Sequence, residues 1–320
     1  TSLPMKKIKS FLIVLIGSTL SIAGLYGFFL SERPPLVEAS LRGIVQNVAP
    51  VTPIDPFKDI FTSARAVFVF DILRNKVIFS RNENEKLPIA SLSKLMTAFV
   101  AKEQMGDNAI ITLTHDDVST EGDSGLRVGE RWRLADLTDT MLLVSSNDAA
   151  RAIASFVGSE GQNNYTGDSA LARASFVQMM NDKAKELGLS TMEFFNESGL
   201  DVISQTRAVA SVSEDSAQAD LPATAGATAG GYGSVREIAL LLVALREKYP
   251  STLEVTTHKD TQVVSQDGIV HFLANTNEAI GNFPGLLASK TGYTNLAGGN
   301  LAILFDIGIG HPVVAVVLGS

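Results

Sequence analysis

The sequence predicts an α+β fold in which both ends of one domain contribute strands to a single antiparallel sheet. Apolar runs rich in β-branched and aromatic residues lie at 66–72 and 76–80, and again at 286–291, 299–306 and 312–318. Segments with helical spacing of apolar residues lie between these two groups. We therefore expect a sheet flanked by helices, together with a second lobe that is mostly helical.

An uncharged run near the N-terminus, from Ser10 to Ser31, predicts a membrane-spanning helix. Its apolar part at 11–30 is long enough to cross a hydrocarbon core of about 30 Å. Three lysines precede the run, which predicts a cytoplasmic N-terminus and export of everything after Glu32. A cleaved signal peptide is the alternative, because residues 21–23 resemble a cleavage site, but the run stays apolar beyond them. We expect residues 1–31 to be an uncleaved, single-pass anchor.

Residues 32–60 have the composition of a tether. Prolines recur in this stretch, and proline disfavours regular structure because it lacks an amide donor and fixes φ. The remaining residues, 61–320, are long enough to form one domain with a substantial core. Within that domain, residues 202–233 are dominated by Ala, Ser, Thr and Gly, which predicts a mobile insertion without a role of its own.

Five helices are predicted inside the domain. The clearest start is the pair Ser234 and Glu237, whose spacing is that of a capping box. The clearest end is Gly188, because glycine is the typical C-cap residue and here follows a helical stripe. The predicted helices span residues 91–103, 134–144, 148–157, 174–187 and 234–245.

Composition excludes several classes of function. The net charge of −8 argues against a nucleic-acid partner, since phosphate binding requires a basic face. The absence of cysteine excludes disulfides, thiol nucleophiles and cysteine-ligated metals. The four histidines include no two at a short ligand spacing, so we expect no metal site and no cofactor.

Three short motifs occur in order along the domain. They are an S-x-x-K motif at Ser91 and Lys94, an S-x-N motif at Ser145 and Asn147, and a K-T-G motif beginning at Lys290. Each motif alone arises readily by chance. Their order and their predicted settings, at a helix start, at a break between helices and on a strand, make the combination specific.

The first motif suits nucleophilic catalysis. Ser91 lies at the predicted start of a helix, where unpaired N–H groups favour an oxyanion, and Lys94 is on the same helical face. A serine at its ordinary pKa is a poor nucleophile and needs an adjacent base. Lysine serves as a base only if burial or a second cation lowers its pKa, and Lys290 is a candidate for that cation.

The other two motifs suit substrate binding and proton transfer. Ser145 is placed to relay a proton between Lys94 and a leaving amine, and Asn147 to bind a substrate amide. On the third motif, Lys290 and Thr291 can bind a carboxylate.

The last residues of the third motif concern the backbone of the strand. Gly292 would let a substrate backbone approach closely. The amide of Tyr293 would then be a second oxyanion donor beside that of Ser91. A substrate would lie antiparallel along this strand, as an added edge.

Longer segments around the motifs resemble the D-alanyl-D-alanine carboxypeptidase family of low-molecular-mass penicillin-binding proteins. They include PIASLSKLMTA, LLVSSNDAARAIA, NESGLD and NTNEAIGNFPGLLASKTGYTNLAGGNLAI, and the similarity covers about residues 60–320 apart from the insertion. The resemblance implies a β-lactamase/transpeptidase-like fold and removal of the terminal D-Ala from peptidoglycan stem peptides outside the cytoplasm, in the periplasm or cell-wall space. It also implies acylation by β-lactams, with Ser91 as nucleophile and Lys94 as base.

The resemblance leaves alternatives and two departures. A DD-endopeptidase acting on cross-links would use the same residues. A serine β-lactamase ranks lower, because Glu193 and Asn196 are three residues apart and not four. A non-catalytic wall-binding protein would be expected to have lost a motif residue, and none is lost. Relatives usually continue past the last strand into a helix, which suggests a C-terminal truncation here, and many have a C-terminal anchor in place of an N-terminal one.

Overall fold

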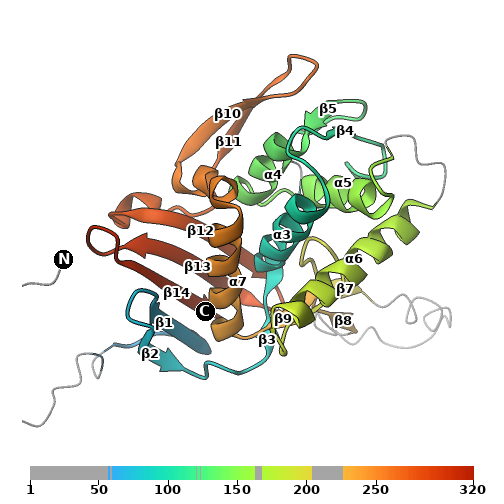
Figure 1. Ribbon diagram of the computed structural model, residues 1–320. Coiled ribbons are helices and arrows are strands. Elements are labelled where there is room, and N and C mark those ends of the chain that lie inside the picture. Colours follow the sequence, from blue (N-terminus) through green and yellow to red (C-terminus); the bar gives the residue numbers. More distant parts are fainter. Residues whose placement is uncertain (1–56, 58–59, 120, 123, 163–167, 204–225) are drawn as a thin grey trace, which may run out of the picture. The chain divides into compact units, whose positions relative to one another are not determined.

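The computed structural model describes residues 57, 60–119, 121–122, 124–162, 168–203 and 226–320 (Figure 1). The predicted anchor and nearly all of the predicted tether therefore lie outside the described residues. Residues Phe61–Ser320 form one compact unit. Among the described residues, no helix has both the length and the apolar character needed to cross a membrane.

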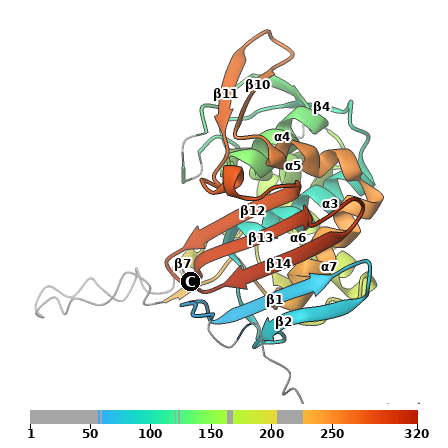
Figure 2. The same ribbon diagram turned by 90° about the vertical axis from the view of Figure 1, so that its left-hand side faces the viewer.

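A five-stranded antiparallel sheet joins the two ends of the domain, as predicted. Its order is β12-β13-β14-β1-β2, and β1 pairs with β14 in a register that places Ala66 opposite Leu318. Strand β12 therefore lies at one edge of the sheet, next to the helical lobe (Figure 2). The strands are β1 (Ala66–Asp71), β2 (Lys76–Arg81), β12 (Leu286–Thr294), β13 (Gly298–Asp306) and β14 (Pro312–Leu318).

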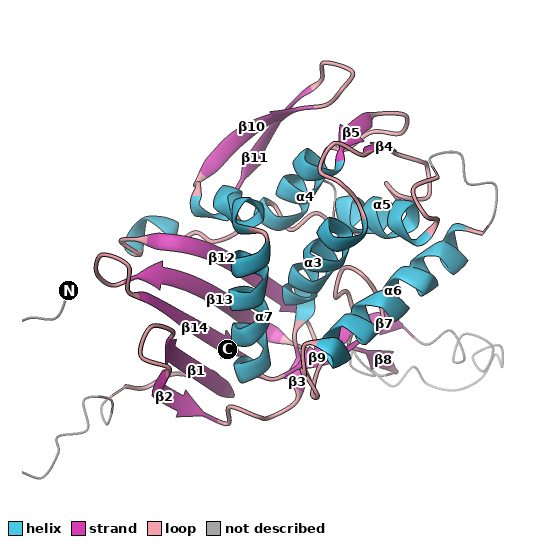
Figure 3. Ribbon diagram, viewed as in Figure 1, coloured by secondary structure: helices cyan, strands magenta, loops and turns pink. Residues whose placement is uncertain are grey.

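The α-helices lie on one side of this sheet and extend beyond its β12 edge (Figure 3). Helix α7 packs on β1, β13 and β14, and its buried residues join those of the sheet in one core. Helix α3 is buried along most of its length, which explains its apolar residues on all sides. The helices are α3 (Lys94–Gln104), α4 (Leu134–Leu143), α5 (Asn147–Gly158), α6 (Ser169–Glu186) and α7 (Val235–Lys248).

Two of the predicted helices begin elsewhere than expected. Helix α6 starts five residues before the predicted position 174, because the Asp168 side chain caps it by accepting a hydrogen bond from the Ala170 amide. The helix predicted from Ser91 begins at Lys94 and follows a 3-10 turn, η1 (Ala90–Ser93). Ala90 has a φ of 48°, in the left-handed region, so the backbone does not enter the α-helix directly.

Helix α7 confirms half of its predicted capping box. The Ser234 hydroxyl accepts a hydrogen bond from the Glu237 amide. The Glu237 carboxylate, however, accepts from the amide and hydroxyl of Thr191. The helix end is therefore tied to a neighbouring loop.

Several short elements were not predicted from the sequence. They have few apolar residues or are too short for a clear period, so their pairing partners define them. They are β3 (Leu87–Pro88), β4 (Ile110–Thr112), β5 (Arg131–Arg133), β6 (Glu193–Phe194), β7 (Val202–Ile203), β8 (Ala227–Thr228), β9 (Gly231–Gly233), β10 (Asp260–Val264), β11 (Val270–Ala274) and the 3-10 helices η3 (Pro250–Thr257) and η4 (Ile280–Asn282).

The predicted insertion at 202–233 overlaps three of these elements, β7, β8 and β9. Strand β9 is the middle strand of a three-stranded sheet with β3 and β6, and Gly231 and Gly233 are buried there. Strand β8 pairs with β7. These residues belong to the fold, while residues 204–225 lie outside the described part of the chain.

Candidate active site

Ser91 lies in the η1 turn, where three packed segments meet. A Cβ added at Gly199 would come within 1.9 Å of the Ala90 carbonyl oxygen, so only glycine allows this approach of the 196–200 loop. On the sheet side, η1 contacts β12. The backbone of the turn is therefore packed on both sides, and this fixes the position of Ser91 in the chain.

The Lys94 amine lies directly beside the Ser91 hydroxyl. Its Nζ is 2.9 Å from Ser91 Oγ, 2.8 Å from Asn147 Oδ1 and 2.8 Å from the Ser198 carbonyl oxygen. These three acceptors match the three N–H donors of an ammonium group. When the amine is neutral, the same short contact lets the Ser91 hydroxyl donate to Nζ.

The surroundings of Lys94 favour the neutral amine. The residue is fully buried. Burial and the nearby charge of Lys290 hold the pKa of Lys94 well below its usual value of 10.5. The charge of Glu197 raises this pKa, but its effect is smaller. The geometry and the lowered pKa are what a general base for Ser91 requires.

The S-x-N motif supplies groups from the start of α5. Between the two motif residues, the Ser146 hydroxyl caps the helix by accepting from the Ala149 amide. Asn147 accepts from Lys94 and donates through Nδ2 to the Glu121 carbonyl oxygen at 2.7 Å. Its carboxamide thus helps to hold Lys94, and the predicted contact of Asn147 with a substrate amide stays a prediction.

Ser145 contacts the other lysine. Its hydroxyl accepts from Lys290 Nζ at 2.9 Å, and no hydrogen bond to Lys94 accompanies this contact. Ser145 is thus paired with Lys290, and its predicted role as a proton relay from Lys94 to the leaving amine stays a prediction. Its φ of 61° lies in the left-handed region, a strained conformation in which the hydroxyl reaches Lys290 on β12.

Lys290 is buried on the edge strand β12. Its Nζ donates to Ser145 Oγ and, at 2.9 Å, to the carbonyl oxygen of Thr291. Burial lowers the pKa of Lys290 to about 7. The Thr291 hydroxyl is half-buried and lies 2.5 Å from the hydroxyl of Thr276, a residue that the motif analysis did not single out.

The next two residues of β12 bring the strand against η1. A Cβ on Gly292 would be 3.1 Å from the Ser91 amide nitrogen and 3.1 Å from the Ile89 carbonyl oxygen. The glycine is therefore needed for packing of β12 on η1, where the sequence predicted a close approach of substrate. The Tyr293 side chain is 70% exposed. The group of this residue that the sequence assigned to the site is its backbone amide.

One functional segment was missed, the loop at 196–200 that supplies the third acceptor of Lys94. The Asn196 carboxamide accepts from the Gly199 amide at 2.6 Å and donates to the Leu200 carbonyl oxygen at 2.8 Å, which fixes the loop. Thr97 on α3 donates to the Glu197 carbonyl oxygen at 2.6 Å. The NESGLD segment was a signal for this loop, but it gave no indication that a backbone carbonyl contacts Lys94.

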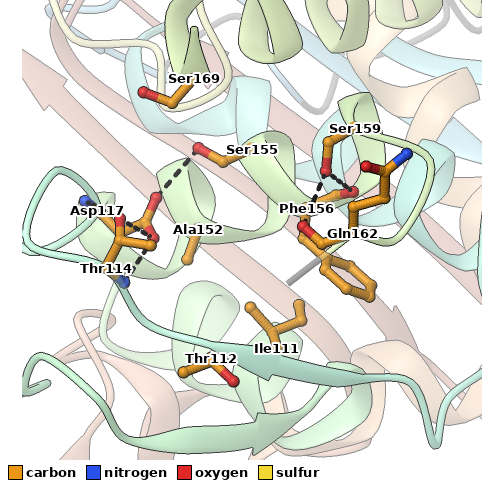
Figure 4. Close-up of a pocket in the computed structure, with 10 residues that line it drawn as sticks. All are labelled: Ile111, Thr112, Thr114, Asp117, Ala152, Ser155, Phe156, Ser159, Gln162 and Ser169. Carbon is orange, nitrogen blue, oxygen red and sulfur yellow. Dashed lines mark hydrogen bonds between the residues drawn. The ribbon is translucent and has the colours of Figure 1, made fainter. Parts of the chain in front are cut away.

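A separate small cavity lies between the β4 region and α5 (Figure 4). Asp117 accepts there from Thr114 and Ser155, and the volume of about 50 Å³ leaves room for only a few water molecules. No motif residue lines it. Within the described residues, no group of three or more His, Asp or Glu side chains is arranged to hold a metal ion.

The fold and the site geometry match what serine acyl transfer with a lysine base requires. The chain belongs to the D-alanyl-D-alanine carboxypeptidase family of peptidases, whose family model matches residues 55–320. This membership confirms the resemblance seen in the sequence.

Individual relatives agree with the family assignment. D-alanyl-D-alanine carboxypeptidase DacF of Bacillus subtilis is 28% identical over 241 residues, which are 73% of this chain and 52% of the relative. DacB2 of Mycobacterium tuberculosis is 26% identical, over 73% of this chain and 67% of the relative. The chain thus spans only about half the length of the B. subtilis protein.

Solved structures confirm the predicted fold. Penicillin-binding protein D2 from Listeria monocytogenes, in its ampicillin-bound form, has a TM-score of 0.61 and 28% identity over 81% of this chain and 91% of that one. A mutant of the Streptomyces K15 DD-transpeptidase has a TM-score of 0.64 at 20% identity, over 82% of this chain and 92% of that one. The transpeptidase-like architecture is therefore shared.

Proposed function

We propose that this protein is a serine D-alanyl-D-alanine carboxypeptidase that removes the terminal D-Ala of peptidoglycan stem peptides. The observation that supports it most is the 2.9 Å contact between Ser91 Oγ and the fully buried Lys94 Nζ. Family membership supplies the substrate class.

In the proposed reaction, neutral Lys94 takes the Ser91 proton as Oγ attacks the carbonyl carbon of the penultimate D-Ala. The backbone amides of Ser91 and Tyr293 would stabilise the oxyanion. When the peptide bond breaks, the leaving D-Ala amine takes the proton that Lys94 accepted from Ser91, relayed by the Ser145 hydroxyl that Lys290 holds by a hydrogen bond, and Lys94 becomes neutral again. Water then attacks the ester while Lys94 accepts its proton. As the acyl bond breaks, Lys94 returns this proton to Ser91 Oγ, which releases the shortened peptide and free Ser91.

Substrate would extend the sheet at β12, which has no other strand of the main sheet on its outer side. Lys290 and Thr291 would bind the free carboxylate of the terminal D-Ala. β-Lactams would acylate Ser91 in the same manner. The ampicillin-bound form of the Listeria protein, 28% identical, supports this expectation.

Product analysis tests the reaction. Incubation with a purified pentapeptide should release one D-Ala, detected by mass spectrometry, and Ser91→Ala should release none. Labelling by a fluorescent penicillin should likewise disappear in Ser91→Ala. Persistent labelling of that variant would reject the assignment of the nucleophile.

A DD-endopeptidase is the second candidate. It is supported by relatives named D-alanyl-D-alanine endopeptidase, such as that of Escherichia coli, 27% identical over 80% of this chain and 71% of the relative. Opening of a cross-linked dimeric muropeptide, without D-Ala release from the pentapeptide, would favour this activity. A β-lactamase has less support, since Glu193 is a surface residue paired with Lys86.

We also propose that residues 1–31 anchor the protein in the cell membrane, with the 61–320 domain on the extracytoplasmic side. The uncharged run and the lysines that precede it support this orientation. The full chain should stay in the membrane pellet after an alkaline carbonate wash, and externally added protease should cleave it in spheroplasts. Release into the supernatant, or complete protection from the protease, would contradict the proposal.

A further inference from the structure

Thr276, which contacts Thr291 of the third motif, is held in place by hydrogen bonds of its own backbone and of the preceding residue. It follows β11, and its amide donates to the Leu143 carbonyl oxygen at 3.2 Å. The preceding Asn275 donates from its amide to the Lys259 carbonyl oxygen, and its side chain donates to the His258 carbonyl oxygen at 2.8 Å. Thr276 is thus fixed between the end of α4, two residues before Ser145, and the edge strand.

The Thr276 hydroxyl completes a pair with that of Thr291. The two Oγ1 atoms are 2.5 Å apart, and either can donate to the other. Thr276 is exposed and Thr291 is half-buried, so the pair is accessible from the solvent. Two hydroxyls in contact leave one O–H free to donate outward, and both can donate if an acceptor with two oxygens replaces their mutual bond.

The charge beside this pair favours an anion. Lys290 Nζ donates to the carbonyl oxygen of Thr291 itself, so a cation lies next to the two hydroxyls. The nearest acidic side chain along the chain, Glu278, is exposed. A carboxylate has two acceptor oxygens in one plane, and charge-assisted hydrogen bonds to it are the strong ones.

We propose that Thr276 is a substrate-binding residue that donates, together with Thr291, to the free carboxylate of the terminal residue of the substrate. This inference rests on the proposed D-Ala-D-Ala peptidase function. Thr276 therefore contributes to recognition of a peptide with a free C-terminal carboxylate over one whose C-terminus is blocked.

The test compares two substrates that differ only at this carboxylate. For the acid form of a D-Ala-D-Ala peptide, Thr276→Val should lower kcat/KM about tenfold or more, mainly through KM. For the C-terminal methyl ester, the same variant should change kcat/KM less than about twofold. Thr276→Ser keeps the hydroxyl and should restore near-normal turnover of the acid.

A matched control removes a hydroxyl outside the cleft. Thr257→Val, on η3, loses a bond to the Glu254 carbonyl oxygen and should leave both substrates unaffected. An equal loss on acid and ester in Thr276→Val, or no loss on the acid, would overturn the inference. If the wild-type protein neither turns over the acid nor is labelled by penicillin, the proposed function itself fails, and that result is distinguishable from failure of Thr276 alone.

Discussion

The two buried lysines of the candidate site differ in their hydrogen-bond partners. Lys94, in the helical lobe, has one acceptor for each ammonium hydrogen, and these come from η1, the start of α5 and the 196–200 loop. Lys290, at the edge of the sheet, has two acceptors, and no acceptor among the described residues takes its third hydrogen. Both side chains are buried, so the difference is that every ammonium hydrogen of Lys94 has an acceptor, whereas one hydrogen of Lys290 is left for a ligand.

This difference indicates how two lysines in one cleft take different roles. Burial lowers the pKa of both, and the charge of Lys290 lowers that of Lys94 further. An amine enclosed by fixed acceptors, with a lowered pKa, suits repeated proton transfer with Ser91. An amine with an unused donor beside two threonine hydroxyls suits anion binding.

The largest expected effect is on the base. Lys94→Arg keeps a cation but cannot deprotonate Ser91, so acylation by a β-lactam should slow about 10³-fold or more. Stopped-flow or gel-based labelling measures the rate, and thermal unfolding should show that the variant remains folded. Near-normal acylation would mean that another group is the base, and the distinction between the roles of Lys94 and Lys290 would then be wrong.

The second largest effect is expected from removing the charge of Lys290, which in our proposal binds the carboxylate of the substrate. Lys290→Gln should lower kcat/KM for a peptide with a free carboxylate about 10- to 100-fold, because a charge-assisted hydrogen bond is lost. In the wild type, the lysine loses its charge as the pH rises through its pKa of about 7. KM for the peptide should therefore increase above neutral pH, and this increase should be absent in Lys290→Gln. A KM independent of pH in the wild type would remove the role assigned to Lys290.

A smaller effect is expected from the charge near Lys94. Glu197 is buried, follows the loop residue Asn196, and its charge raises the pKa of Lys94 against the effect of burial. In Glu197→Gln the pKa of Lys94 should fall further, so the acidic limb of the acylation rate should move to lower pH. Glu193→Gln, which removes an exposed charge paired with Lys86, is the control and should leave the limb in place. A shift to higher pH in Glu197→Gln would contradict this account.

The smallest effect is expected from removal of residues 204–225. Strands β7 and β8 pair with Ile203 opposite Ala227, so a two-residue turn can replace residues 204–225. Hydrolysis of a small D-Ala-D-Ala peptide by this deletion variant should remain within about twofold of wild type. Collapse of turnover in a variant with unchanged thermal unfolding would assign this segment a part in catalysis.

The sequence predicted the main sheet and the motif residues because both depend on side-chain identity. Alternating or continuous apolar runs marked the strands, and three short motifs marked Ser91, Lys94 and Lys290. The partners of these residues depend on where the backbone runs. The Ser198 carbonyl on Lys94, the pairing of Ser145 with Lys290 and the contact of Thr276 with Thr291 all join segments distant in the chain.

Strand β9 illustrates the same limit. Two of its three residues are glycines, so it has almost no side chains to form a period, and the sequence grouped it with the insertion. Its place in the sheet comes from pairing with β3 and β6. A Cβ on Gly231 would lie 2.8 Å from Ser93 Oγ, so close packing next to η1 explains the glycine.

The charge state of the two amines can be observed directly by NMR titration of the full chain in detergent, with lysine labelled at Nζ. Two resonances should titrate far below the ordinary lysine range, one near pH 7 that is lost in Lys290→Gln and another that is lost in Lys94→Arg. If every lysine instead titrates at its ordinary value near 10.5, Lys94 is protonated at working pH and cannot be the base for Ser91.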